Sequence, residues 1–307
     1  MNGQKTRSTR VLVVGATGQM GRKIVRELCA LGRADVRVTH REGASSEALE
    51  ALRSTGAELV VADLGDEPAL ARACRGVDVV VSAVQGLRDV IVDGQTRLLR
   101  AAENEGVARM IPSDYALDFF QTEEGKNRNL DLRRELNRVL DQSSVRGTSV
   151  LCGAFMDLLA YGAMGPDPKT GVFRVWGGFD ERADFARTDD VAKYVAEVAL
   201  DRDAPRIVRV AGDTKSVREI GAIFEELRGT PVTLESAGSL EALSQLIDKL
   251  RAEDPAETNT FPMWQRLQYS RDMQSGRGRF AANDNARYPS VHPLDMRTFL
   301  SRAFAKR

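Results

Sequence analysis

The stretch from Val11 to Gly21 carries the residues in this chain that are best suited to holding a phosphate group. An apolar run, Val11–Val14, is followed at once by glycines at positions 15, 18 and 21. Glycines at this spacing let a backbone turn tightly and approach a pyrophosphate, while helix N-terminal N–H groups and the helix dipole attract its charge. An ordinary strand-to-helix turn can also use glycine, but the flanking pattern favours a nucleotide site.

Both elements that such a site needs are indicated by the surrounding residues. The uninterrupted apolar run Val11–Val14 is typical of a strand buried on both faces. Apolar residues then recur at helical spacing and predict a helix that begins inside the glycine run. These helical positions are Met20, Ile24, Val25, Leu28 and Leu31.

Further strands alternate with helices through the first half of the chain. Apolar segments predict strands at 36–39, 58–62, 78–82, 109–112 and 148–151, and helices at 90–105 and 130–142. Without hairpin signals, this alternation indicates an α/β fold with a doubly wound parallel sheet. Ligands bind such sheets outside the carboxyl ends of the strands. The segments expected there are 15–21, 39–41, 63, 82–86 and 112–115.

The end of the second predicted strand bears on the choice of cofactor. An acidic residue there suits a ribose 2′-hydroxyl, whereas an arginine suits a 2′-phosphate. This strand ends in Thr39, His40 and Arg41. A guanidinium can bind a phosphate with two charge-assisted hydrogen bonds, so Arg41 favours NADP(H) over NAD(H). A solvated loop charge is the alternative interpretation of Arg41.

Two further segments at the same edge are candidates for cofactor contacts. Asp63, with Leu64 beside it, follows the third predicted strand and suits an adenine contact, although aspartate there is also a common turn former. The small residues around Ala83, Val84 and Gln85 lie where the middle of a dinucleotide would pass. Tight packing of helix on sheet explains the same small residues equally well.

The bulk composition excludes several classes of function. Lys+Arg and Asp+Glu both number 44, so no net charge favours nucleic acid or an anionic membrane. No apolar run approaches the length of a membrane span. The odd count of 3 cysteines indicates reduced thiols, and the 2 histidines have no metal-ligand spacing. We therefore expect a cytoplasmic protein without a metal site.

Taken together, these motifs resemble those of the NmrA-like and isoflavone-reductase-like group, atypical members of the short-chain dehydrogenase/reductase superfamily. The resemblance covers nearly the whole chain. One segment, Ile111 to Tyr115, is similar to the family's Pro-Ser-Glu-Phe segment, and Phe155 is similar to the aromatic residue that borders the nicotinamide. The other matching parts are residues 15–21, Arg41, 153–155, 185–192 and 287–291.

The resemblance implies a Rossmann-type fold with a smaller α+β substrate domain and NADP(H) as cofactor. We expect residues 1–155 to form the NADP-binding domain, with 183–212 returning to it, and residues 156–182 and 213–307 to form the substrate domain. The expected cofactor-binding residues are Gly15, Thr17, Gly18, Gln19, Met20, Gly21, Arg41, Asp63, Leu64, Ala83, Val84, Gln85, Ser113 and Phe155.

The catalytic position is where this chain departs from the family pattern. The resemblance implies a catalytic lysine on the helix after the Pro-Ser-Glu segment, but residues 129–136 contain Arg133 and Arg134 and no lysine. An arginine can orient an oxyanion but hardly donates a proton, because its pKa lies above about 12. The candidates for catalysis are Tyr115, Lys126 and Arg133. A packed tyrosine, a solvated lysine and helix-surface charge are the respective alternatives.

Two functions of different class remain open from the sequence. The first is an NADPH-dependent reductase that transfers hydride to a small, aromatic or carbonyl- or enone-bearing substrate. Phe155, Tyr161 and Trp176 would then wall a substrate pocket, although aromatic core is the default interpretation. The second is a non-catalytic NADP-sensing regulator that binds a protein partner, which the missing lysine favours. A homodimer is compatible with either.

Overall fold

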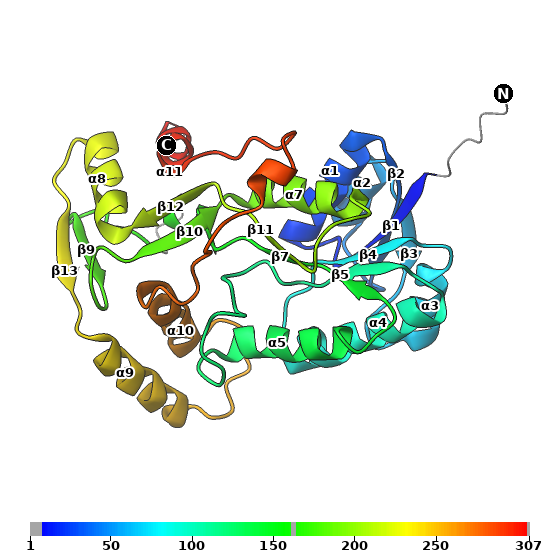
Figure 1. Cartoon of the computed structure of the whole chain (residues 1–307), viewed down its shortest axis with the longest axis horizontal. Coiled ribbons are helices and arrows are strands. Elements are labelled where there is room, and N and C mark those ends of the chain that lie inside the picture. Colours follow the sequence, from blue (N-terminus) through cyan, green and yellow to red (C-terminus); the bar gives the residue numbers. More distant parts are fainter. Residues whose placement is uncertain (1–7, 161–163, 306–307) are drawn as a thin grey trace. The chain divides into compact units, whose positions relative to one another are not determined.

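A parallel sheet of six strands, in the order β3-β2-β1-β4-β5-β6, organises the first half of the chain (Figure 1). This is the strand order of dinucleotide-binding doubly wound sheets, and it confirms the predicted Rossmann-type α/β fold. The strands are β1 (Thr9–Val14), β2 (Ala34–His40), β3 (Glu58–Val61), β4 (Val79–Ser82), β5 (Arg109–Ile111) and β6 (Arg146–Gly147).

Helices cover both faces of this sheet. Helices α1 (Gln19–Leu31) and α2 (Ser46–Arg53) lie on one face, and α3 (Glu67–Cys74) and α4 (Gln95–Asn104) lie on the other (Figure 1). The central strand β1 is therefore enclosed, which is why Val11–Val14 needs no polar residue. Side chains cap two of the helices, since Ser45 accepts a hydrogen bond from the Ala48 N–H and Asp66 accepts one from the Ala69 N–H.

The structure departs from the sequence prediction at two elements. The helix expected at 90–105 begins instead as a π-helix, Asp89–Gly94, and becomes α-helical only in α4. The strand expected at 148–151 forms as β7 (Ser149–Leu151), but it pairs with β11 (Ile207–Arg209), and β6 takes the sixth place in the parallel sheet. A short apolar run predicts a buried strand without naming its partner.

The structure is a computed structural model that describes residues 8–160 and 164–305, and these divide into two compact units. The first unit contains the chain up to Asp114 with Leu132–Val150 and Ala192–Val208. The second contains Tyr115–Asp131, Leu151–Val191 and the chain from Arg209. In the described ranges, no helix is long and apolar enough to cross a membrane.

The second unit contains two small sheets and several helices. Strand β10 (Arg182–Ala186) pairs antiparallel with β12 (Asp213–Ser216) and parallel with β8 (Ala154–Phe155). Strands β9 (Val172–Val175) and β13 (Thr233–Ser236) form the second, parallel pair. Helix α8 (Val217–Arg228) begins with a capping box between Ser216 and Glu219. The remaining α-helices of the described residues are α5 (Arg128–Leu140), α6 (Asp157–Ala160), α7 (Thr188–Leu200), α9 (Leu240–Glu253), α10 (Met263–Gln274) and α11 (Met296–Phe304).

Candidate dinucleotide-binding site

The glycine loop connects β1 to α1, and two of its three glycines are required by the chain's own packing. Gly15 has a φ of 84°, and a Cβ atom there would lie 2.6 Å from the carbonyl oxygen of Ala83. A Cβ atom at Gly21 would lie 2.2 Å from the carbonyl oxygen of Gly15. Both distances are far below any normal contact, so no other residue fits at these positions without moving the backbone.

Gly18 is different, because the chain's own packing restricts a side chain there far less than at Gly15 or Gly21. Its φ of −75° suits any residue, and an added Cβ atom would lie 3.3 Å from its nearest neighbour, the carbonyl oxygen of Gly15. Gly18 is the N-cap residue of α1 and brings no side-chain acceptor to the helix N-terminus. First-turn N–H groups beside an uncovered backbone are what a diphosphate requires.

The ends of β2 and β3 place two more predicted residues along the same edge of the sheet. Arg41 follows β2 directly and its side chain is exposed. The Ala62 N–H donates to the His40 carbonyl at 3.0 Å, so the ends of the two strands lie side by side. Asp63 is exposed, and its Oδ1 accepts a hydrogen bond from the Gly65 N–H at 2.8 Å. The Asp63 carboxylate therefore also shapes its own turn.

The segment after β4 is held against both the glycine loop and the end of β5. The Ala83 N–H donates to the Val14 carbonyl at 2.8 Å. The Ser113 hydroxyl donates to the Val84 carbonyl at 2.7 Å, and the Ser113 N–H donates to the side-chain oxygen of the buried Gln95 at 3.1 Å. The hydrogen bond from the Ser113 hydroxyl thus stabilises the segment around Val84, which we expect to border the cofactor. Leu64, half-buried, and Gln85, exposed, complete the predicted set along this edge.

Arg133 is the predicted catalytic candidate that lies in the first unit. Its side chain is half-buried on α5, and its Nε–H donates to the Ser113 carbonyl at 3.1 Å. The residue after Ser113, Asp114, is fully buried, and its Oδ2 accepts hydrogen bonds from Asn137 at 2.7 Å and Ser149 at 2.8 Å. Burial raises the pKa of the Asp114 carboxyl, partly opposed by these hydrogen bonds and by the nearby charge of Arg133.

The other predicted residues belong to the second unit. Tyr115 is buried, and Phe155 is half-buried in β8. Lys126 is exposed, and its carbonyl accepts a hydrogen bond from the guanidinium of Arg271. Trp176 is half-buried, and Tyr161 lies outside the described residues. The structure thus brings together the glycine loop, Ala83, Val84, Ser113 and Arg133 within the first unit.

Sequence reasoning missed the side chains that brace Ser113 and Arg133. They come from four separate parts of the chain: Gln95, Asn137, Ser149 and Arg206. The spacing of Asn137, one helical turn after Arg133, offered a partial signal, because residues four apart share a helix face.

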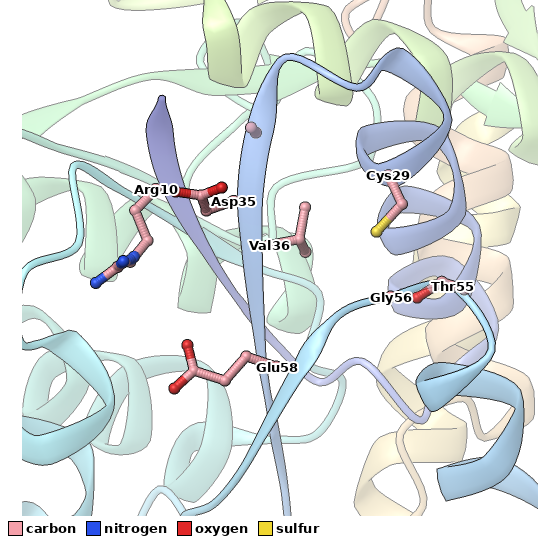
Figure 2. Close-up of a pocket in the computed structure, with 8 residues that line it drawn as sticks. Arg10, Cys29, Asp35, Val36, Thr55, Gly56 and Glu58 are labelled. Atoms are coloured by element: carbon pink, nitrogen blue, oxygen red, sulfur yellow. The ribbon is translucent and has the colours of Figure 1, made fainter. Parts of the chain in front are cut away.

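A hollow of about 540 Å³ lies at the opposite edge of the six-stranded sheet (Figure 2). Arg10, Asp35 and Glu58, near the starts of β1, β2 and β3, line it together with Cys29 and Thr55. The amino ends of the strands are therefore around this hollow, whereas dinucleotides bind at the carboxyl ends. The hollow is distinct from the candidate cofactor site.

The strand order and the glycine loop define the class: a protein with a Rossmann-type fold. Within that class, the chain belongs to the NmrA-like family, whose sequence model matches residues 7–269. It is 26% identical over 269 residues to phenylcoumaran benzylic ether reductase PT1 of Pinus taeda, covering 82% of this chain and 83% of that one. It is 30% identical over 238 residues to the bifunctional pinoresinol-lariciresinol reductase of Linum perenne, covering 71% and 75%.

Solved structures share the fold over nearly the whole chain. AtPrR2 with NADP+ and (+)pinoresinol matches with a TM-score of 0.79 at 24% identity, covering 97% of this chain and 99% of that one. The NADPH-dependent quinone oxidoreductase QOR2 of Escherichia coli, complexed with NADPH, matches with a TM-score of 0.76 at 20% identity, covering 96% and 99%. These two structures contain NADP+ and NADPH respectively, and the relatives named above are reductases.

Proposed function

We propose that this chain is an NADPH-dependent reductase of the isoflavone-reductase-like type, which transfers hydride to a small aromatic or carbonyl- or enone-bearing substrate. The observation that carries the proposal is Gly18, the N-cap residue of α1, where the protein's own packing restricts a side chain far less than at Gly15 or Gly21. The N–H groups at the N-terminus of α1, with no side chain over Gly18, would hold a diphosphate. The named reductases among the relatives support the same reaction class.

The residues of the first unit divide the binding of NADP(H) among them. First-turn N–H groups of α1, from Gln19, Met20 and Gly21, would hold the diphosphate, with Thr17 and Gly18 beside it. Arg41 would bind the 2′-phosphate, which its exposed position after β2 allows. Asp63 and Leu64 would border the adenosine, and Ala83, Val84 and Gln85 would border the middle of the cofactor. When bound, NADPH supplies a hydride.

Near the nicotinamide, the reaction needs a positive charge beside the substrate oxygen and a group that donates a proton to it. Arg133 would stabilise negative charge on the substrate oxygen, since its guanidinium stays charged at neutral pH. Tyr115 and Lys126 are the candidate proton donors, because Arg133 cannot release a proton at neutral pH. Phe155 would border the nicotinamide, and Trp176 would contribute an apolar wall to the substrate pocket.

Calorimetry with NADPH and NADH tests the cofactor assignment directly. We expect NADPH to bind more tightly, and Arg41→Gln to weaken NADPH binding by about 10- to 100-fold while leaving NADH little changed, since charge-assisted hydrogen bonds contribute about 1.5–3 kcal/mol. Arg72→Gln, an exposed arginine on α3, is the matched control. Absence of binding heat with both coenzymes would overturn the proposal.

Turnover then separates the reductase from the second candidate function. NADPH oxidation is followed by the loss of the near-ultraviolet absorbance of the reduced nicotinamide, with benzylideneacetone, benzaldehyde and menadione as probe substrates. We expect turnover of the enone or the quinone. The absence of a lysine at Arg133 favours the alternative, an NADP-sensing regulator with a protein partner. Tight NADPH binding without oxidation of any probe, together with a partner captured only in one redox state, would favour that regulator.

A further inference from the structure

Two consecutive residues at the end of β5 hold two residues that lie one turn apart on α5. The Ser113 carbonyl accepts a hydrogen bond from the Nε–H of Arg133 at 3.1 Å. The next residue, Asp114, accepts one from the side-chain amide of Asn137 at 2.7 Å. The same Asn137 amide also donates to the backbone carbonyl of Arg133 at 2.9 Å. Strand end and helix are thus attached at two points.

The buried Ser149, the half-buried Arg206 and the exposed Asp141 add further hydrogen bonds to this attachment. The Ser149 hydroxyl donates to Asp114 Oδ2 at 2.8 Å and lies 2.9 Å from Asn137 Oδ1. Arg206 donates to Ser149 Oγ at 2.9 Å, to Asn137 Oδ1 at 2.6 Å and to Asp141 Oδ1 at 2.7 Å. Asp114, Asn137 and Ser149 are at most 1% exposed. Asp114 Oδ1 is buried without a hydrogen-bond partner, but the hydrogen bonds of Asp114 Oδ2, Asn137 and Ser149 join the strand end to the helix and restrict their relative movement.

The inner side reaches the segment expected to border the cofactor. Ser113 is fixed by Gln95 through its N–H and to the Val84 carbonyl through its hydroxyl. Val84 in turn lies beside the glycine loop, where a Cβ atom on Gly15 would come within 3.1 Å of it. A rigid chain of contacts therefore runs from the glycine loop through Val84 and Ser113 to the guanidinium of Arg133.

We propose that Asp114 and Asn137 are positioning residues, which fix the guanidinium of Arg133 relative to the cofactor-binding loop. The inference deepens the proposed function and rests on it for its kinetic consequence. An oxygen-stabilising group must be held within about 0.5 Å of its productive position, and such precision comes from surrounding hydrogen bonds. Arg133, a long and flexible side chain, needs such bracing more than a short residue would.

The position of Arg133 is measurable without any turnover, by the exchange of its Nε–H proton in protein labelled with ¹⁵N-arginine. The signal is assigned by its loss in Arg133→Lys. We expect Asn137→Leu, which keeps the volume but removes the hydrogen bonds, to accelerate this exchange at least about tenfold, since the Ser113 contact loosens. Asp114→Asn retains an acceptor oxygen and should keep the proton protected. The Nε–H of Arg97, which donates to the Leu64 carbonyl at 2.7 Å, is the internal control.

Steady-state kinetics test whether the position of the Arg133 guanidinium affects substrate reduction. With menadione and benzylideneacetone, Asn137→Leu should lower kcat about tenfold while the KM for NADPH stays unchanged. The single variant Asp114→Asn should keep most of the wild-type rate. If Asn137→Leu does not fold, Asn137→Ser is the milder variant for both measurements. Unchanged exchange at Arg133 in the folded variant would overturn the proposal. Faster exchange in a protein that oxidises no NADPH would support positioning and count against the proposed function instead.

Discussion

The two halves of the candidate site are built from different parts of the polypeptide. The diphosphate half is made of backbone: the glycines at 15, 18 and 21 and the first-turn N–H groups of α1. The reaction half is made of side chains, with Arg133 held on Ser113 and braced through Asn137 and Asp114. A backbone site tolerates change around it, because only the fold must persist. A side-chain site can be altered by single substitutions while the fold remains.

This difference explains how a family fold can keep its cofactor and change its chemistry. The glycine loop is complete here, whereas the helix expected to carry a lysine carries Arg133. Lysine can shift its pKa and release a proton, while arginine remains a fixed charge. The binding half therefore predicts a dinucleotide, with Arg41 favouring NADP(H), and the reaction half predicts charge stabilisation with the proton coming from another group.

The largest effect is expected inside the glycine loop itself. Gly21→Ala places a Cβ atom 2.2 Å from the Gly15 carbonyl oxygen, and we expect it to destabilise the fold by about 3 kcal/mol or more. Gly18→Ala places its Cβ atom 3.3 Å from the Gly15 carbonyl oxygen, a tight contact that a backbone shift of a few tenths of an ångström relieves. The fold should therefore persist while NADPH binding weakens by about 100-fold, or about 2.8 kcal/mol. Urea unfolding and calorimetry on both variants separate the two effects. A Gly18→Ala protein that binds NADPH normally would refute the backbone site.

In the reaction half, Arg133→Ala should affect the rate and not the fold. Removing one group that stabilises developing negative charge costs about 10²–10³ in kcat. The KM for NADPH should not change, because the diphosphate contacts are untouched. Arg134→Ala, the neighbouring arginine on α5, is the matched control. Equal losses in the two variants would mean that general charge on α5 matters, and not the position of Arg133.

The proton donor is expected to differ from the charged group. Tyr115→Phe removes a single hydroxyl from a buried side chain, and we expect kcat to fall by about 100-fold if that hydroxyl is the general acid. Lys126→Ala should change kcat by less than about threefold, because the Lys126 side chain is exposed and its ammonium stays hydrated. Steady-state NADPH oxidation by both variants decides between them. A larger loss of kcat in Lys126→Ala than in Tyr115→Phe would assign the proton donor to Lys126.

The sequence predicted the fold well for a physical reason. Strand β1, the glycine loop and α1 are contiguous, so periodicity and glycine spacing encode them locally. The bracing of Arg133 draws on Gln95, Ser113, Ser149 and Arg206, which only the fold brings together. The same limit applies to β7, whose apolar residues predicted a strand but not its pairing with β11.

The smallest expected effect is a change in how stability depends on pH. Burial raises the pKa of Asp114 above its ordinary value of 3.8. The folded protein therefore binds this proton more tightly than the unfolded chain does, and the contribution of Asp114 to stability falls as the pH rises from 3.8 through the raised folded pKa. Asp114→Asn carries no such charge, so its stability relative to the wild type should improve as the pH rises.

Glu103 provides the control of opposite sign in the same unit. Hydrogen bonds from Ser144 and Ser143 lower its pKa below the ordinary value of 4.5. Its stabilising contribution is therefore present above that value and is lost as the pH falls through the folded pKa. Glu103→Gln should fall further behind the wild type as the pH rises, whereas Asp114→Asn should gain. Urea unfolding across this range measures both slopes. A flat Asp114→Asn slope, or one parallel to that of Glu103→Gln, would mean that burial does not raise the Asp114 pKa in the folded protein.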